Sequence, residues 1–469
     1  MPVIDHNHLC VIIGLIRLTA GEAGGTGMEK TKRGLSSPQI IILGFGAAIL
    51  LGSLLLMLPF ATRDGRGAPF ADALFTATSA VCVTGLVVRD TATYWSGFGQ
   101  AVLLLMIQIG GMGVVTFSVV IASAAKRRIS LKQRGLMRDA ISAPQIGGIL
   151  RLTSFIITLT AIFELTGAAL LSLVFCREFG LWKGLWYGLF HGVSAFCNAG
   201  FDLMGVKSQY SSLTSFAGHP AVNLVVMALI IIGGIGFMTW SDLKANRLRF
   251  RRYRMQTKVV LVTSALLLVL PAAYFFFFEF AGLRPGERFW GALFQSVTAR
   301  TAGFNTIDFN VLSEGGLGIM ILLMLTGGAP GSTAGGMKVT TLAVMVSTAF
   351  SIFHRREETH FFGRRVEEDT VRSAMAILTL YLTLFFFGGL IISRVEGLPL
   401  LTCLFETASA VGTVGVTLGI TPQLGQLSRG VLILLMYCGR VGALTLVFAA
   451  LSEGRGAAAR LPKEQLIVG

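Results

Sequence analysis

Four short segments of the chain share a glycine that follows a phenylalanine by nine or ten residues and precedes an apolar residue. They are Phe75–Leu86, Phe190–Phe201, Phe294–Phe304 and Phe405–Val416. Each lies between two hydrophobic runs long enough to cross a bilayer. Glycine permits the dihedral angles that turn successive carbonyls to one side, and a ring of such carbonyls can replace the water shell of a monovalent cation. These segments therefore predict cation binding by backbone oxygen atoms inside a membrane.

The predicted lining of this ring consists of the three residues that end at each glycine. They are Val83, Thr84, Gly85, Asn198, Ala199, Gly200, Thr301, Ala302, Gly303, Thr413, Val414 and Gly415. A single such glycine would be explained more simply by close helix packing. Four at matching positions favour the ring, because packing glycines need no short helix before them. The third copy is one residue shorter and carries Arg300, which we expect behind the loop and turned toward a carboxylate, with Glu406 as the candidate partner.

Membrane helices are the elements that must position these segments. Only 13% of the residues are charged and 53% are hydrophobic, and a soluble domain of this size could not cover itself with so little charge. The stretch of about 10–12 residues that ends at each glycine suits a re-entrant half-helix, whose negative C-terminal end would face the cation. Uncharged runs of spanning length flank the segments: Ile40–Phe60, Gly97–Ala125, Leu152–Cys176, Ala221–Trp240, Val259–Phe278, Leu317–Phe353, Ala374–Ser393 and Val431–Leu451.

The predicted fold is an all-α polytopic membrane protein with four pseudo-fourfold repeats of span, re-entrant loop and span around one central pore. We expect eight transmembrane helices and four re-entrant half-helices. The predicted divisions are a tail (1–38), repeats 39–140, 141–255, 256–366 with a gate loop at 326–336, and 367–453, and a second tail (454–469). Because the number of spans is even and basic clusters separate the repeats, both termini and the linkers are expected in the cytoplasm.

The net charge of +15 is concentrated in three clusters, Lys126–Arg138, Lys244–Lys258 and His354–Arg365. In a soluble chain this surplus would indicate nucleic acid, but between membrane spans it is typical of cytoplasmic loops beside a lipid bilayer. We therefore expect no nucleic-acid partner. Residues 1–27 precede Met28 and the first span, and we interpret them as a dispensable extension. Three acidic residues after the glycines, Asp90, Asp202 and Asp308, are either ordinary loop residues or a weak attraction for cations at the external mouth.

A glycine-rich stretch interrupts the sixth apolar run. Thr326–Gly336 contains five glycines and one proline, so a regular helix cannot pass through it. It is either a kink whose hydroxyls satisfy the freed backbone or a flexible gate beneath the ring. Arg440 lies in the middle of the last run, where pairing with carbonyls and forming an electrostatic barrier are both open. The predicted gate residues are Thr326, Gly327, Gly328, Gly331, Ser332, Thr333, Gly335, Gly336 and Arg440.

Several motifs resemble the Trk/Ktr/HKT superfamily of potassium transporters, over nearly all of Ile40–Leu451. Gln108–Phe117 and Gly233–Leu243 resemble the second helices of its first two repeats, Thr326–Lys338 its intramembrane gating loop and Cys438–Leu446 its last helix. Eight spans are most similar to the Ktr-type membrane subunit. The resemblance implies potassium uptake across the cell (inner) membrane through a selectivity filter, in a homodimer on a ring of cytosolic nucleotide-binding regulatory subunits. It implies K+ as the transported ion, with Na+ as a co-ion or activator.

Other functions fit the residues less well. A Na+-preferring or poorly selective transporter of the same superfamily is the nearest alternative, although the resemblance ties Na+ preference to serine where this chain has Gly85. A membrane enzyme would need facing catalytic residues, and His191 and His219 have no matching partner in the sequence. An organic-solute carrier would not require four equivalent loops. The chain has no G-x-G-x-x-G motif, so nucleotide sensing is assigned to a partner. We expect no enzymatic activity, no covalent cofactor and no transition-metal site.

Overall fold

The computed structural model describes residues 36–114, 116–117, 135, 149–247 and 249–450. The chain divides into two units, Met1–Ser36 and Ser37–Gly469, and all described helices belong to the second. The predicted extension at 1–27, the basic cluster Lys126–Arg138 and the tail at 454–469 lie outside the described residues. Within the described part the elements are helices and turns, apart from one antiparallel hairpin of β1 (His360–Phe361) and β2 (Arg364–Arg365).

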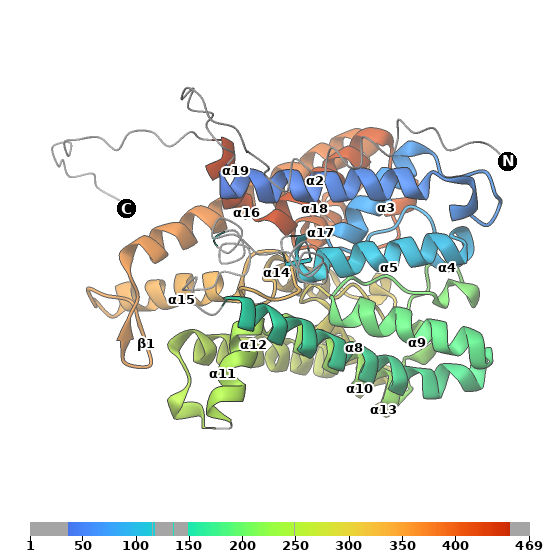
Figure 1. The fold of residues 1–469 in the computed structure, drawn as a ribbon. Helices are drawn as coiled ribbons and strands as arrows, with labels where there is room; N and C mark the ends of the chain where they lie inside the picture. Colours follow the sequence, from blue (N-terminus) through green and yellow to red (C-terminus); the bar gives the residue numbers. More distant parts are fainter. Residues whose placement is uncertain (1–35, 115, 118–134, 136–148, 248, 451–469) are drawn as a thin grey trace, which may run out of the picture. The chain divides into compact units, whose positions relative to one another are not determined.

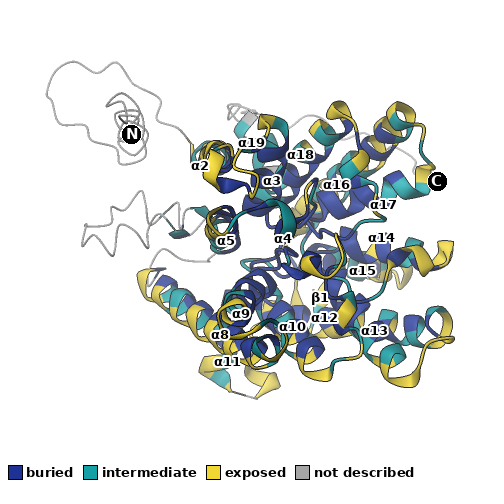
Figure 2. Ribbon diagram, turned by 90° about the vertical axis from the view of Figure 1, so that its right-hand side faces the viewer, coloured by how far each residue is buried: buried dark blue, intermediate teal, exposed yellow. Residues whose placement is uncertain are grey.

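Among the described residues, four helices are long and apolar enough to cross a membrane. They are α2 (Ser37–Leu56), α8 (Ile149–Phe179), α12 (Met255–Tyr274, continued by the π-helical turn η5, Phe275–Glu279) and α16 (Glu368–Glu396). They coincide with the first run of each predicted pair. Only 22% to 39% of their most apolar windows is buried, and Figure 2 shows broad exposed bands on these outer helices. Apolar faces of this extent require lipid contact.

The four predicted half-helices form α3 (Phe70–Val81), α9 (Leu181–Phe196), α13 (Pro285–Thr298) and α17 (Leu400–Val411). Three of them have a proline at the N-terminus: Pro285 is the first residue of α13, and Pro69 and Pro399 directly precede α3 and α17. Proline has no amide hydrogen that would need an acceptor at this position. Each packs against the long helix that precedes it in the chain (Figure 1). The phenylalanine that opens each glycine segment is the anchor of that helix, since all four of these rings are fully buried.

The second run of each pair is broken, whereas the sequence predicted a break only in the third. α5 (Gly97–Met112) ends at Gly113, and α10 (Pro220–Gly234) meets α11 (Phe237–Asn246) at 94°. α14 (Glu314–Leu325) and α15 (Val339–Phe353) flank the glycine-rich stretch, and α18 (Gln426–Val441) is separated from α19 (Ala443–Ala450) by Gly442. Gly113, Gly236 and Gly442 have φ of 83°, 89° and 92°. The hydrophobicity of a run does not indicate where its helix breaks. Glycine adopts the left-handed backbone of these breaks at no steric cost.

The helices close into a ring. Each broken helix packs against the next half-helix along the chain: α5 on α9, α10 on α13, α14 on α17, and α18 on α3. The last helices lie beside the first, because α18 and α19 also contact α2 (Figure 1). Short turns complete the fold: α4 (Thr91–Tyr94), η1 (Pro59–Ala61), η2 (Met204–Val206), η3 (Thr214–Phe216), η4 (Phe250–Arg252), η6 (Phe309–Val311) and η7 (Thr421–Gln423).

Candidate functional site

The chain makes the same strained turn after every half-helix. The first residue of each predicted lining triplet has a left-handed backbone: φ is 57° at Val83, 57° at Asn198, 66° at Thr301 and 51° at Thr413. All four triplet glycines also have positive φ. Three of those first positions carry a β-branched side chain, for which a left-handed backbone costs about 1–3 kcal/mol. Such strain persists only where the surrounding structure imposes it.

Backbone hydrogen bonds impose the turn. In the first, second and fourth copies the amide of the middle triplet residue donates to a carbonyl five residues back, each at 2.8 Å, as between Thr84 and Ser79. The preceding amide donates to a carbonyl three residues back, which completes a Schellman motif. In the third copy, which is one residue shorter, Ala302 donates instead to Thr298 four residues back, at 3.0 Å.

In each loop, a hydroxyl at a matching position of the half-helix makes a further hydrogen bond that stabilises the turn. The hydroxyls of Ser79 and Ser409 accept from the amides of Gly85 and Gly415, both at 3.0 Å. Ser194 donates to the Phe201 carbonyl at 2.7 Å, and Thr298 donates to the Phe304 carbonyl. Sequence reasoning missed these residues, although a signal exists: each half-helix contains Ser-Ala or Thr-Ala at the corresponding place.

The structure brings the four triplets together around one centre, in cyclic order. A methyl group built on Gly85 would lie 2.6 Å from the Ala199 carbonyl oxygen, and one on Gly200 would lie 2.9 Å from that of Ala302. On Gly303 it would lie 2.6 Å from the Val414 oxygen, and on Gly415 it would lie 2.0 Å from the Thr84 oxygen, which closes the circle. The carbonyls before the four glycines therefore surround a common axis, and no position there has room for a side chain.

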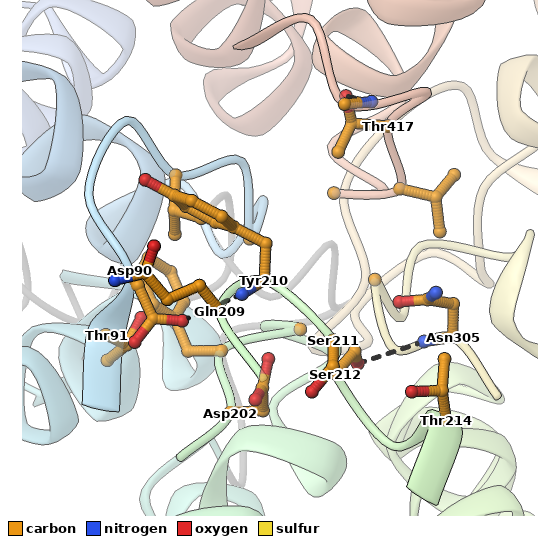
Figure 3. Close-up of a pocket in the computed structure, with 18 of the residues that line it drawn as sticks. Asp90, Thr91, Asp202, Gln209, Tyr210, Ser211, Ser212, Thr214, Asn305 and Thr417 are labelled. Carbon is orange, nitrogen blue, oxygen red and sulfur yellow. Dashed lines mark hydrogen bonds between the residues drawn. The ribbon is translucent and has the colours of Figure 1, made fainter. Parts of the chain in front are cut away.

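A cavity of about 520 Å³ lies on one side of this ring, lined by the four glycines and by the polar loops that follow them (Figure 3). The carboxylate of Asp90 is occupied structurally, because it accepts from the amides of Thr93 (2.8 Å) and Tyr210 (3.0 Å). Asp308 similarly accepts from the amide of Asn310 at 3.0 Å. Burial, with a smaller contribution from Asp90, raises the pKa of Asp202 to about 7. Asp90 and Asp308 therefore stabilise these loops and give the cavity negative charge, whereas Asp202 is only partly ionised at neutral pH.

The glycine-rich stretch lies on the opposite side of the ring, since it contacts residues that precede the glycines. Thr333 donates its hydroxyl to the Phe196 carbonyl at 3.0 Å, and a methyl group on Gly335 would lie 2.1 Å from the Thr413 hydroxyl. The loop closes on itself, because Gly327 donates to the Met337 carbonyl at 2.7 Å. Lys338 donates to the Ala334 carbonyl at 2.8 Å. The stretch is therefore an irregular segment between two helices. Most of its backbone hydrogen-bonding groups have partners, as is required of a segment inside a bilayer.

Arg440 joins this loop to two helices. Its guanidinium donates to the carbonyls of Thr333 in the loop and Gly110 at the end of α5, and to that of Gly111 at 3.1 Å. The pairing with carbonyls that the sequence left open is thus present. The three acceptors lie more than 100 residues from Arg440 in the chain, so only the tertiary structure identifies them.

The expected pairing of Arg300 with Glu406 is wrong. Arg300 donates from Nη2 to the Ser264 hydroxyl on α12 at 3.1 Å. Glu406 is buried and accepts from the hydroxyls of Thr417, at 2.8 Å, and Thr421. The two side chains do not meet, because they point in different directions. Glu406 faces the loop after Gly415, whereas Arg300 turns toward α12.

Two further polar clusters support the half-helices. The buried Asp72 carboxylate on α3 accepts from Arg89 at 2.8 Å and from Arg429 on α18 at 2.9 Å. Glu164 on α8 accepts from Gln108 at 3.2 Å and from the Cys197 thiol at 3.5 Å. Both clusters join residues far apart in the chain, which explains why sequence reasoning did not assign them.

Several known proteins are similar to this chain in sequence or in fold. Residues 36–455 match the TrkH family model, described as cation transport protein. The chain is 38% identical over 452 residues to the potassium/sodium uptake protein NtpJ of Enterococcus hirae, covering 94% of this chain and 99% of that protein. It is 38% identical over 420 residues to the Ktr system potassium uptake protein B of Bacillus subtilis, covering 88% and 92%.

A solved structure, the potassium transporter TrkH from Vibrio parahaemolyticus, matches with a TM-score of 0.73 and 18% identity, covering 95% of this chain and 90% of that one. At that identity the match shows a shared fold. The family model and the relatives show common ancestry with these transporters, and they confirm the resemblance that the sequence motifs indicated. The chain is therefore a multi-pass membrane protein of the TrkH cation transport family, a membrane subunit of the Trk/Ktr superfamily.

Proposed function

We propose that this protein takes up K+ across the cell membrane by a channel-like route through the four lining triplets. The observation that carries the proposal is the cyclic contact of the four glycines, each beside the carbonyl that precedes the next glycine. Relatives at 38% identity are named potassium uptake proteins, which supports K+ as the cargo.

The carbonyl ring would act as the selectivity filter. A cation that sheds its water needs several oxygen ligands at once, and backbone carbonyls supply them without a fixed charge. The four half-helices end at the ring, so their partially negative C-termini stabilise a cation there. The left-handed residues and the hydroxyl bonds hold the carbonyls in place before the ion arrives, which lowers the reorganisation needed for binding.

The glycine-rich loop and Arg440 would form the gate. The loop lies directly under the ring, and the Arg440 guanidinium adds a positive charge beside the ion path. Withdrawal of the loop would break the bond between Arg440 and Thr333 and open the path. Shared motion of α5, α18 and the loop is the expected route for control, because Arg440 connects all three.

The arrangement in the membrane follows from the same proposal. Four repeats with the predicted boundaries give eight spans, with loops entering from outside and both termini in the cytoplasm. The basic segments Lys244–Lys258 and His354–Arg365 would then face the cytoplasm. They provide a surface for a ring of nucleotide-binding subunits under a homodimer, an assembly consistent with the Ktr system to which relatives belong by name.

Growth of a bacterium that lacks K+ uptake tests the function. Expression of the chain, with and without a Ktr-type regulatory subunit, should restore growth at low K+. Intact surface expression without rescue would refute the proposal. A poorly selective or Na+-preferring transporter is the second candidate, because one relative is named a potassium/sodium uptake protein. Rb+ and Na+ fluxes in proteoliposomes distinguish the two, and the same assay with added Na+ tests activation.

A further inference from the structure

The residue three positions before each filter glycine lies against the broken helix of the preceding repeat. A methyl group on Gly111 of α5 would lie 2.5 Å from Cys197, and one on Gly412 would lie 2.2 Å from the Met324 carbonyl on α14. In both loops the residue at this position is small. In the third loop it is Arg300, and its neighbours are Gly234 and Ile235 at the end of α10.

Arg300 has hydrogen-bonding capacity that the described structure leaves unused. The side chain is buried, with 8% of its surface exposed. Nη2 donates to Ser264, and Nε is buried without a hydrogen-bond partner among the described residues. No ion pair to a carboxylate is formed by Arg300 within this part of the chain. A buried guanidinium with an unmet donor is costly, so the position requires a physical explanation.

The gate loop provides an explanation, because it lies near two arginines, the buried Arg300 and the half-buried Arg440. Arg440 sits at the C-terminal end of α5 and binds the loop at Thr333. Arg300 sits at the C-terminal end of α10 and shares a small cavity of about 10 Å³ with Gly328 of the loop. Helix C-termini are the negative ends of their dipoles and favour a cation. Two helix breaks thus hold two positive groups beside one loop.

The flank near Arg300 is also where the loop is packed. Ala329 joins Ile235, Val260 and Val339 in a separate apolar cluster. Val260 and Ser264 are one turn apart on α12, so the hydroxyl that holds Arg300 lies next to that cluster. The amide of Thr333 also donates to the Gly233 carbonyl of α10 at 3.3 Å. The loop can therefore stay attached to α10 when the Thr333 carbonyl leaves Arg440.

We propose that Arg300 is the positioning residue of the open gate. When Thr333 leaves Arg440, the Thr333 carbonyl loses that donor, and a carbonyl without a donor inside a membrane costs free energy. The unused N–H groups of Arg300 replace that donor and retain the loop against α10. The inference rests on the gate assigned under the proposed function, and it gives the two arginines opposite effects on flux.

Rb+ uptake into proteoliposomes of the full chain, without a partner subunit, tests this. R440Q should raise the flux about tenfold, the effect of one lost hydrogen bond to a charged group. Adding R300Q should lower that raised flux at least about threefold, while R300K should retain it. The control is R288Q in the R440Q background, since Arg288 lies on α13, which leads into the Arg300 turn, and donates to the Phe276 carbonyl at 2.7 Å, away from the loop. The flux of the R440Q/R288Q variant should equal that of R440Q.

The K+/Na+ flux ratio separates gating from damage to the filter, and it should stay unchanged in R300Q. A changed ratio, or an R440Q/R300Q flux equal to that of R440Q, overturns the inference and leaves the proposed function standing. Absence of cation flux in every variant, including R440Q, overturns the proposed function as well. If R300Q does not fold, S264A replaces it: freeing Arg300 from its hydroxyl should raise the flux in the R440Q background, and a lower flux contradicts the proposal.

Discussion

At the scale of single residues, three of the four glycine loops hold branched side chains in a backbone conformation that is unfavourable for such side chains. Val83, Thr301 and Thr413 adopt left-handed backbones, and the Schellman bonds and hydroxyls of the half-helices offset the strain. The glycine two positions later in each loop is under a different constraint. It has positive φ and also touches the neighbouring loop, so alanine fails there both by conformation and by contact.

Gly85→Ala should therefore abolish selective K+ uptake. The added methyl would lie 2.6 Å from the Ala199 carbonyl oxygen at φ of 94°, which displaces an oxygen of the ring. Rb+ and Na+ fluxes in proteoliposomes should show lost K+ flux or a relaxed ratio. Gly97→Ala is the matched control, because a methyl group there meets nothing within 4 Å. Wild-type selectivity in Gly85→Ala would exclude the ring as the filter.

The serine hydroxyls should influence selectivity more than stability. Ser79→Ala removes one acceptor for the Gly85 amide, a loss of about 0.5–1.5 kcal/mol. Since that bond orients the peptide that carries the Thr84 carbonyl, the K+/Na+ ratio should fall while the protein stays folded. Thr383→Ala, on the exposed face of α16, is the control, because its hydroxyl bonds only within its own helix. An unchanged ratio would make Ser79 a packing residue only.

At the scale of elements, Asp72 connects the first half-helix to the last broken helix. Asp72→Asn leaves Arg429 largely buried beside a neutral group, although Arg89 is half exposed and can be hydrated. We expect a loss of about 1–3 kcal/mol in the free energy of unfolding, seen as a lower Tm in detergent. Glu368→Gln is the control, since its pair with Arg372 is exposed. Equal Tm values for the two variants would contradict the role of Asp72 as a clamp.

The glycine-rich loop is an element whose removal should increase activity. Deleting Gly331–Thr333 removes the one acceptor of Arg440 that belongs to the loop, and the contact with the Phe196 carbonyl. Rb+ flux without a partner subunit should rise well above that of the full chain, with the K+/Na+ ratio retained because the ring is untouched. A folded deletion variant with unchanged flux would argue for a kink without a gating role.

At the scale of the whole molecule, the proposed orientation can be tested by labelling from outside intact cells. Gln209 lines the cavity beyond the ring, and Phe362 lies exposed in the hairpin within the basic segment His354–Arg365. A membrane-impermeant maleimide should label Gln209→Cys but not Phe362→Cys until the membrane is opened. The reverse pattern would invert the topology and place the gate on the external side.

The sequence by itself determined the membrane class, the four short helices that precede the glycines, and the interrupted sixth run. These follow from local properties: apolar length, scarcity of charge, and glycine or proline content within about ten residues. Family membership followed from motifs of the same short range. The breaks at Gly113, Gly236 and Gly442 were missed because an apolar run continues through them.

Only the tertiary structure decided which side chains meet. Arg440 joins α18 to α5 and the loop, Asp72 joins α3 to α18, and Arg300 binds Ser264 in place of the expected Glu406. In each case the partners lie between 36 and about 360 residues apart in the chain. Buried polar groups in a membrane bind the donors and acceptors that the closed ring of helices brings within reach, and no local pattern specifies those neighbours.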